Sequence, residues 1–289
     1  MKGFLQRAGR AAPTSCGRRL EISEDAFGEL TESEVSSRID DLRSQMSAQG
    51  YLFFRGFSQC SAVENARNCL LKALETEAAL DPRYPLEDGI AASEFVSDLR
   101  AEGGNYPAIH RLPREAGIER LFARLLGEEV RCVDHTWIRV KSPGRSTAPH
   151  CDIVYHQRGS PRINTIWMPL GDVPMELGPL MLLEGSNRSE RLRNGYCNLD
   201  VSAGRNGTRL RFRHGGFFRG GQYTKKPDAA QRELGGRWLT ADFRSGDMVI
   251  FSSFTLHGAL DNQSKRLRLS LDARYQPARD PTDPRWPTD

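Results

Sequence analysis

Residues 164–183 read Asn164-Thr-Ile-Trp-Met-Pro-Leu-Gly-Asp-Val-Pro-Met-Glu-Leu-Gly-Pro-Leu-Met-Leu-Leu183. Two apolar runs, 164–170 and 180–183, flank a turn that is rich in glycine, proline and aspartate. Neither run has the length or the 3.6-residue period of an amphipathic helix, so each is expected to form a buried strand. The stretch therefore predicts two consecutive strands without a crossover helix between them.

The same pattern continues on both sides of this stretch. Short β-rich runs separated by Gly, Pro and Asp turns cover 132–140, 238–243, 248–251 and 267–275. Short strands at this spacing are typical of a sandwich or a jelly roll. The sequence contains neither GxGxxG nor GxxxxGK[ST], so dinucleotide-binding and P-loop folds lose their main support. We expect an α+β, mainly β protein whose jelly-roll core covers about 130–277.

Helical patterns precede this β-rich region. The first helix is predicted from a capping box at Thr31 to a stop at Gly50, with apolar residues at helical spacing between them. The aromatic run 51–57 is expected to be a strand, and further helices are predicted over 61–80 and 115–126. These N-terminal helices would buttress one sheet of the core.

The rest of the chain is organised around this core. Residues 1–20 carry five basic residues and no acidic one, but they lack the apolar segment of a secretory signal. We expect a disordered tail there, with an organelle-targeting segment as the alternative, and a single domain over 21–289. The polar, Gly- and Arg-rich insertion 186–236 is predicted to be a lid-like loop near the site.

Composition limits the class of protein. No apolar run approaches the roughly 18–20 residues of a membrane span, and the mean hydropathy is −0.56. A net charge of +4 is too mild for a nucleic-acid-binding protein, and no basic stripe with interleaved aromatic residues is present. Only six of the 41 basic residues are lysines; because arginine suits carboxylates and phosphates, an anionic ligand is one interpretation. The six cysteines form no CxxC pair, which favours free thiols and a cytoplasmic location.

Candidate metal ligands come from two separate stretches. In His150-Cys-Asp152, residues i and i+2 of a strand point to the same side, so an imidazole and a carboxylate can bind one ion. His257 follows the buried run 248–251 and would supply the second imidazole. Two histidines and one carboxylate form a facial triad that leaves positions open on Fe(II).

An arginine completes this set. Arg268 stands eleven residues after His257 in an alternating basic and apolar run. Its guanidinium would bind the distal carboxylate of a dicarboxylate co-substrate in a bidentate pair. Ser270 shares that side of the strand and is a candidate for a further hydrogen bond to the same carboxylate. Arg266 is the rival, and the offset from His257 favours Arg268.

These motifs, together with residues 165–186, resemble the phytanoyl-CoA dioxygenase family over roughly 50–57 and 130–275. Members are Fe(II)/2-oxoglutarate oxygenases on a double-stranded β-helix, a cupin-like jelly roll. The resemblance implies Fe(II), 2-oxoglutarate and O₂ as cofactor and co-substrates. It also implies a set of site residues: the iron ligands His150, Asp152 and His257, the 2-oxoglutarate ligand Arg268, and the co-substrate pocket residues Trp137 and Trp167.

The expected reaction is the oxidation, most simply the hydroxylation, of an unactivated C–H bond in a small-molecule substrate, with release of succinate and CO₂. Desaturation and oxidative ring closure stay open, whereas Asp152 argues against halogenation because chloride would need its position. The acyl-CoA substrate of the namesake enzyme is not carried over. A non-catalytic metal-binding jelly roll and a zinc-dependent hydrolase are the alternatives, and neither needs Arg268.

Overall fold

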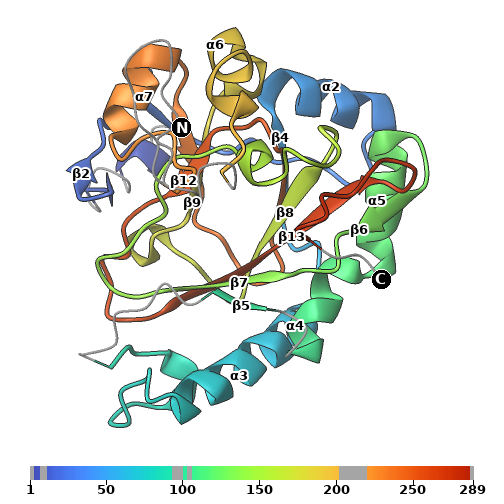
Figure 1. Ribbon diagram of the computed structural model, residues 1–289. Helices are drawn as coiled ribbons and strands as arrows, with labels where there is room; N and C mark the ends of the chain where they lie inside the picture. The colour runs from blue at the N-terminus through green and yellow to red at the C-terminus, as the bar shows by residue number, and fades with distance from the viewer. Residues whose placement is uncertain (1–2, 7–11, 93–99, 103–105, 202–219, 287–289) are drawn as a thin grey trace.

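The computed structural model describes residues 3–6, 12–92, 100–102, 106–201 and 220–286 (Figure 1). In this part of the chain, a seven-stranded antiparallel sheet has the order β4-β11-β8-β13-β7-β5, and β6 also pairs with β13. Its strands are β4 (Tyr51–Phe54), β11 (Met248–Ser252), β8 (Asn164–Pro169), β13 (Arg268–Pro277), β7 (Trp137–Lys141), β5 (Arg100–Glu102) and β6 (Val130–Cys132).

A smaller sheet packs against the inner side of the larger one. Within the described ranges it has four strands in the order β12-β9-β10-β3: β12 (His257–Ala259), β9 (Leu180–Leu183), β10 (Trp238–Thr240) and β3 (Phe27–Glu29). Only the β10–β3 pair is parallel. The chain passes from β8 in the large sheet to β9 in the small one, and from β11 through β12 back to β13. This alternation between two packed sheets confirms the predicted jelly roll.

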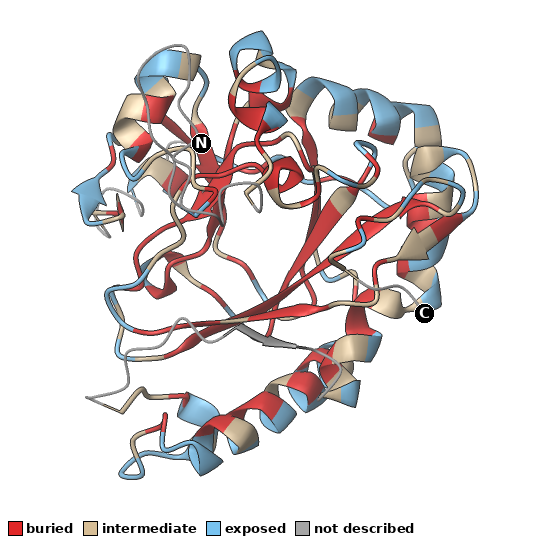
Figure 2. Ribbon diagram, in the orientation of Figure 1, coloured by how far each residue is buried: buried red, intermediate tan, exposed pale blue. Residues whose placement is uncertain are grey.

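The two sides of β13 have opposite chemistry because successive strand residues point in opposite directions. One side carries Leu269, Leu271 and Ala273, which join an apolar cluster with residues of α3 (Cys60–Thr76), α4 (Pro107–Arg111) and α5 (Ala116–Leu126). These helices lie against the outer side of the large sheet (Figure 1), and their buried sides face it (Figure 2). The predicted helical buttress is therefore present. The other side of β13 carries Arg268, Ser270, Asp272 and Arg274, and it faces the interior of the jelly roll.

The first predicted helix begins later than its capping box indicates. Helix α2 covers Ile39–Gln49, and the residues before it are not helical. Glu32 forms a bridge with Phe53 of β4, and the amide of Ser33 donates to the Phe53 carbonyl. Pairing with the exposed edge of β4 thus displaces the first two turns of the predicted helix. The stop at Gly50 is correct, and its φ of 82° is a conformation that glycine adopts without strain.

The insertion 186–236 contains short helices both before and after residues 202–219, so these two parts are not structureless loops. Its helices are η6 (Ser186–Arg188), α6 (Glu190–Arg193), η7 (Tyr196–Asn198) and α7 (Pro227–Leu234). Five arginines of this predicted lid-like loop lie at 205–219, outside the described residues. The lid therefore stays a prediction. The other 3-10 helices are η1 (Leu86–Asp88), η3 (Leu112–Arg114), η4 (Asp152–Tyr155) and η5 (Met175–Leu177).

The prediction of a disordered tail is wrong for residues 12–20. They form the hairpin of β1 (Thr14–Ser15) and β2 (Arg18–Arg19), which packs on the segment after β12. The Ser15 hydroxyl donates to the carbonyl of Ala259 at 2.8 Å, and the amide of Gly17 donates to Asp261 Oδ2 at 2.9 Å. These polar contacts order the hairpin although its sequence lacks a long apolar run.

None of the helices in the described ranges is both long enough and apolar enough to pass through a membrane.

Candidate metal centre and its cavities

A backbone bridge fixes the positions of His150 and His257. Each amide donates to the other residue's carbonyl at 2.9 Å, so the two side chains lie directly across from each other, with ring centroids 4.2 Å apart. The neighbouring Gly258 permits this approach, because a Cβ there would lie 2.7 Å from the carbonyl oxygen of Thr147. The pairing of β12 therefore brings together two histidines that are 107 positions apart in the sequence.

The tautomer of each histidine leaves a lone pair directed at the site. His150 Nδ1 lies 2.9 Å from the carbonyl oxygen of Ala148, and His257 Nδ1 lies 3.0 Å from that of Thr255. Since a carbonyl only accepts hydrogen bonds, both Nδ1 atoms carry the proton and both Nε2 atoms are free to bind a metal. Burial also lowers the pKa of His257 to about 4, which keeps its ring neutral.

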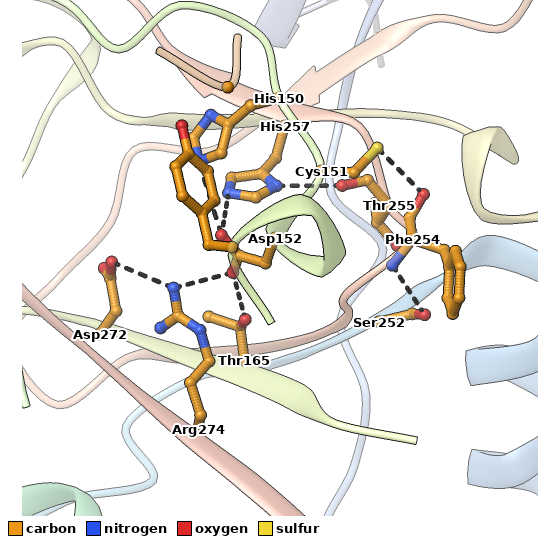
Figure 3. Close-up of polar contacts among 12 residues, drawn as sticks. His150, Cys151, Asp152, Thr165, Ser252, Phe254, Thr255, His257, Asp272 and Arg274 are labelled. Atoms are coloured by element: carbon orange, nitrogen blue, oxygen red, sulfur yellow. Dashed lines mark hydrogen bonds and ion pairs between the residues drawn. The ribbon is translucent and has the colours of Figure 1, made fainter. Parts of the chain in front are cut away.

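Asp152 completes the cluster. Its Oδ1 lies 3.5 Å from His150 Nε2 and 3.7 Å from His257 Nε2, and the three ligand atoms fit within 4.8 Å of one another (Figure 3). All three side chains are buried. The prediction that His150 and Asp152 share a strand is wrong, because Asp152 is the first residue of the 3-10 helix η4. Cys151 between them keeps an extended backbone (φ −109°, ψ 137°), so the two side chains still point to one side although η4 begins at Asp152.

The second carboxylate oxygen of Asp152 is held by residues that the sequence analysis did not single out. Arg274 Nη2 lies 2.9 Å from Oδ2, and the Thr165 hydroxyl donates to the same atom (Figure 3). Burial alone would raise the pKa of Asp152, but the charge of the Arg274 guanidinium outweighs burial and holds that pKa well below its usual range. Asp152 is therefore a carboxylate with one oxygen fixed and the other directed at the histidines.

Arg268 and Ser270 lie together on the interior side of β13. Arg268 is buried, and its Nη1 donates to the Ser270 hydroxyl at 2.7 Å. A cavity of about 30 Å³ reaches from Arg268 to His150 and His257, and Trp167 forms part of its wall. Ser270 contacts the guanidinium of Arg268 and is not part of that wall.

Trp137 lies elsewhere than predicted. It lines a larger cavity of about 470 Å³, which opens beside His150 and Asp152, and it is not part of the wall of the Arg268 cavity. The guanidinium of Arg274 lies 4.6 Å from the centre of its ring. The cation that holds Asp152 thus lies over the ring of Trp137, and both side chains line the larger cavity.

The donor set fits iron. Two imidazole nitrogens and one carboxylate oxygen converge from one side, as in a two-histidine, one-carboxylate site with open positions. Hydrogen bonds from both Nδ1 atoms, and from Arg274 and Thr165 to the carboxylate, orient the three ligands from behind.

Comparison with known proteins gives a family match. The family model described as "Phytanoyl-CoA dioxygenase (PhyH)" matches residues 46–270. No curated protein matches the sequence.

Several solved structures share the fold. The non-heme alpha ketoglutarate dependent carbocyclase SnoK from nogalamycin biosynthesis is 20% identical, with a TM-score of 0.60 over 89% of this chain and 90% of that chain. The epimerase SnoN from the same biosynthesis is 19% identical, with a TM-score of 0.58 and 85% of each chain covered. EctD from S. alaskensis is 18% identical, with a TM-score of 0.57 over 92% of this chain and 87% of that chain.

Proposed function

Because this chain belongs to the phytanoyl-CoA dioxygenase family, we propose that His150, Asp152 and His257 hold its iron and that Arg268 binds 2-oxoglutarate. The protein is a non-haem, 2-oxoglutarate-dependent oxygenase. The observation that carries the residue assignment is the convergence of three buried ligand atoms within 4.8 Å, next to a cavity that ends at Arg268.

Each residue has a defined task in this proposal. His150 and His257 present unprotonated Nε2 atoms, and Asp152 supplies the negative charge. Arg268, fixed by Ser270, binds the distal carboxylate of 2-oxoglutarate through charge-assisted hydrogen bonds. When bound, iron with 2-oxoglutarate and O₂ supplies the oxidant that removes hydrogen from a substrate C–H bond, and succinate and CO₂ are released.

The alternative functions are less well supported. A zinc hydrolase or a non-catalytic jelly roll does not need a buried arginine at the end of a cavity beside the metal ligands. Membership in the oxygenase family also favours the redox reaction. We propose hydroxylation as its simplest outcome.

The substrate that we propose is a small anionic molecule that binds in the larger cavity. The volume of this cavity, about 470 Å³, falls within the usual range of small-molecule sites. Among the described residues, five cationic side chains and two carboxylates line it. Among the similar structures, one of SnoN contains Fe3+, alpha ketoglutarate and nogalamycin RO, and one of EctD contains 2-oxoglutarate and 5-hydroxyectoine. A cytoplasmic location is part of the proposal, on the cysteine pattern of the sequence.

The residue assignment is tested with Asp152→Ala. This change removes the only anionic ligand, so the variant should lose both tight Fe(II) binding and substrate-dependent succinate production. Asp40→Ala is the matched control, because Asp40 is exposed on α2 and is not part of the wall of either cavity. Near-wild-type iron affinity in Asp152→Ala would exclude Asp152 as a ligand.

A further inference from the structure

Part of the wall of the larger cavity comes from outside the family segment 46–270. Cys16 and Gly17, in the turn of the β1–β2 hairpin, line one side, and Trp286 lines another. The rest of the wall includes His150 and Asp152, so a molecule in the cavity lies next to the proposed iron ligands.

Specific contacts hold these added walls in place. The amide of Cys16 donates to the Ser146 hydroxyl at 3.0 Å, which ties the hairpin turn to the loop after β7. The indole of Trp286 donates to the carbonyl of Tyr155 at 3.0 Å, and the preceding Arg285 binds Asp200 at 2.6 Å. Both walls are therefore built features of the cavity.

Trp286 extends an aromatic wall. Its ring centroid lies 5.1 Å from that of Trp137 and 5.8 Å from that of His156. His156 is buried, and burial lowers its pKa to about 3, so the ring is neutral. Trp286, Trp137 and the neutral His156 ring thus form one aromatic side of the cavity, and an apolar ring system matches this wall.

A cationic wall adjoins the aromatic one. Two of the five lining cations are already engaged with carboxylates: Arg139 lies 2.6 Å from Asp272, and Arg274 lies 2.9 Å from Asp152. Lys141, which is buried, also lines the cavity, and Arg145 and Lys225 are exposed. Asp261, the second lining carboxylate, accepts the hydrogen bond of Gly17. The positive charge of this wall therefore exceeds what the lining carboxylates neutralise.

We propose that Trp286 and the hairpin turn at Cys16 and Gly17 are specificity-determining walls, which select an anionic molecule with an apolar ring system. The ring would pack against Trp286 and Trp137, and the anionic group would bind Arg145 and Lys225. This inference rests on the proposed function only in that it places the bound molecule beside the iron.

The test compares two probes that share a ring system and differ in charge, 2-naphthoate and 2-naphthamide. Binding is measured by calorimetry on the nickel-loaded protein with saturating 2-oxoglutarate. Nickel in place of iron prevents turnover, and 2-oxoglutarate occupies Arg268 so that the probes do not bind there. We expect one molecule of 2-naphthoate to bind about tenfold more tightly than 2-naphthamide, because ionic hydrogen bonds add to ring burial. Equal affinities would overturn the anionic part of the inference.

Variants assign the two walls. Arg145→Gln with Lys225→Gln should remove the preference for 2-naphthoate, whereas Lys226→Gln, a neighbouring exposed lysine outside the cavity, should keep it. Trp286→Ala should weaken both probes equally, with Trp286→Phe retaining most of the affinity. Cys16→Phe should block both probes by filling the cavity.

If these variants bind both probes as the wild type does, the inference is wrong. If the wild-type protein binds neither nickel nor 2-oxoglutarate, the proposed function is contradicted instead. Failure of the further inference and failure of the proposed function are therefore distinguishable.

Discussion

The two oxygens of the Asp152 carboxylate have different partners. Oδ1 faces the Nε2 atoms of His150 and His257, whereas Oδ2 is held by Arg274 and Thr165. Because Oδ2 is occupied, the carboxylate presents a single oxygen to the ligand cluster. Arg274 is thus a positioning residue, which acts on the metal centre through Asp152.

Replacing Arg274 with Met keeps most of the side-chain volume but leaves a buried carboxylate without its cation. The nickel affinity should weaken by about 10- to 100-fold, as is typical when a partner of a metal ligand is removed. The free energy of unfolding of the metal-free protein should fall by about 3–5 kcal/mol. Calorimetry and chemical unfolding measure the two effects. Arg279→Met, which removes a surface pair with Glu128, is the control, and unchanged nickel affinity in Arg274→Met would refute the positioning role.

A second prediction at this scale separates two neighbouring arginines. Arg268→Leu should raise the KM for 2-oxoglutarate by about tenfold to a hundredfold with little change in iron affinity, because a bidentate ionic contact is lost. Arg266→Leu should be much milder, since Arg266 is half-exposed and is not part of the wall of the Arg268 cavity. Steady-state kinetics with varied 2-oxoglutarate decides, and a larger effect of Arg266→Leu would reverse the assignment.

Strand β13 serves two purposes through its two sides. Leu269, Leu271 and Ala273 belong to the core under the helices, whereas Arg268 and Ser270 face the jelly-roll interior, where Arg268 lines the cavity beside the two histidines. Since neighbouring residues on the strand belong to different environments, stability and co-substrate binding are separable within this single element.

Leu271→Ala and Ser270→Ala test this separation. Leu271 is fully buried, so its truncation should lower the free energy of unfolding by about 2–5 kcal/mol and leave the KM for 2-oxoglutarate unchanged. Ser270→Ala removes the acceptor that fixes Arg268, so it should raise that KM about fivefold and cost at most about 1 kcal/mol of stability. Thermal unfolding and steady-state kinetics are measured on both variants. If both variants lose stability equally, or both raise the KM equally, the two sides of β13 are not separable.

At the scale of the whole molecule, the parts that could be predicted are those encoded locally. Apolar runs bounded by turn residues predicted the strands, and the motif pattern singled out His150, Asp152 and His257, whose side chains lie together in the fold. The start of α2 could not be predicted, because Glu32 and Ser33 pair with a strand edge that exists only in the folded protein.

The rest of the site depended on contacts between distant segments. Arg274 shares the interior side of β13 with Arg268, which was a usable signal, but its partner Asp152 lies 122 positions away. Trp286 gave no signal at all, because a tryptophan near Pro residues carries no periodicity. Its role follows from the position of the segment after β13 beside η4.

Burial of His156 gives the whole protein a dependence on pH. Its pKa is lowered to about 3 in the folded protein, chiefly by burial and then by Arg274, from an ordinary value of 6.5. Above pH 6.5 the ring is neutral in both the folded and the unfolded state, so it does not make the free energy of unfolding depend on pH. Between pH 6.5 and 3 only the unfolded chain binds the proton, so stability falls by up to roughly 1.4 kcal/mol per pH unit.

We therefore expect the metal-free wild-type protein to lose stability faster than His156→Gln as the pH falls from 7 to 5. Urea unfolding at several pH values measures the difference between the two proteins. Curves that stay parallel would show that His156 does not titrate differently on folding.

The placement of Trp286 and the β1–β2 turn outside residues 46–270 has a consequence for comparative genomics. Proteins grouped by alignment of the family segment would share an oxidation chemistry while accepting unrelated compounds. Annotation transfer for this protein should therefore weigh the sequence around positions 14–17 and 286 above overall similarity. Homologues that match there are the ones whose genomic neighbourhoods would point to a common metabolite.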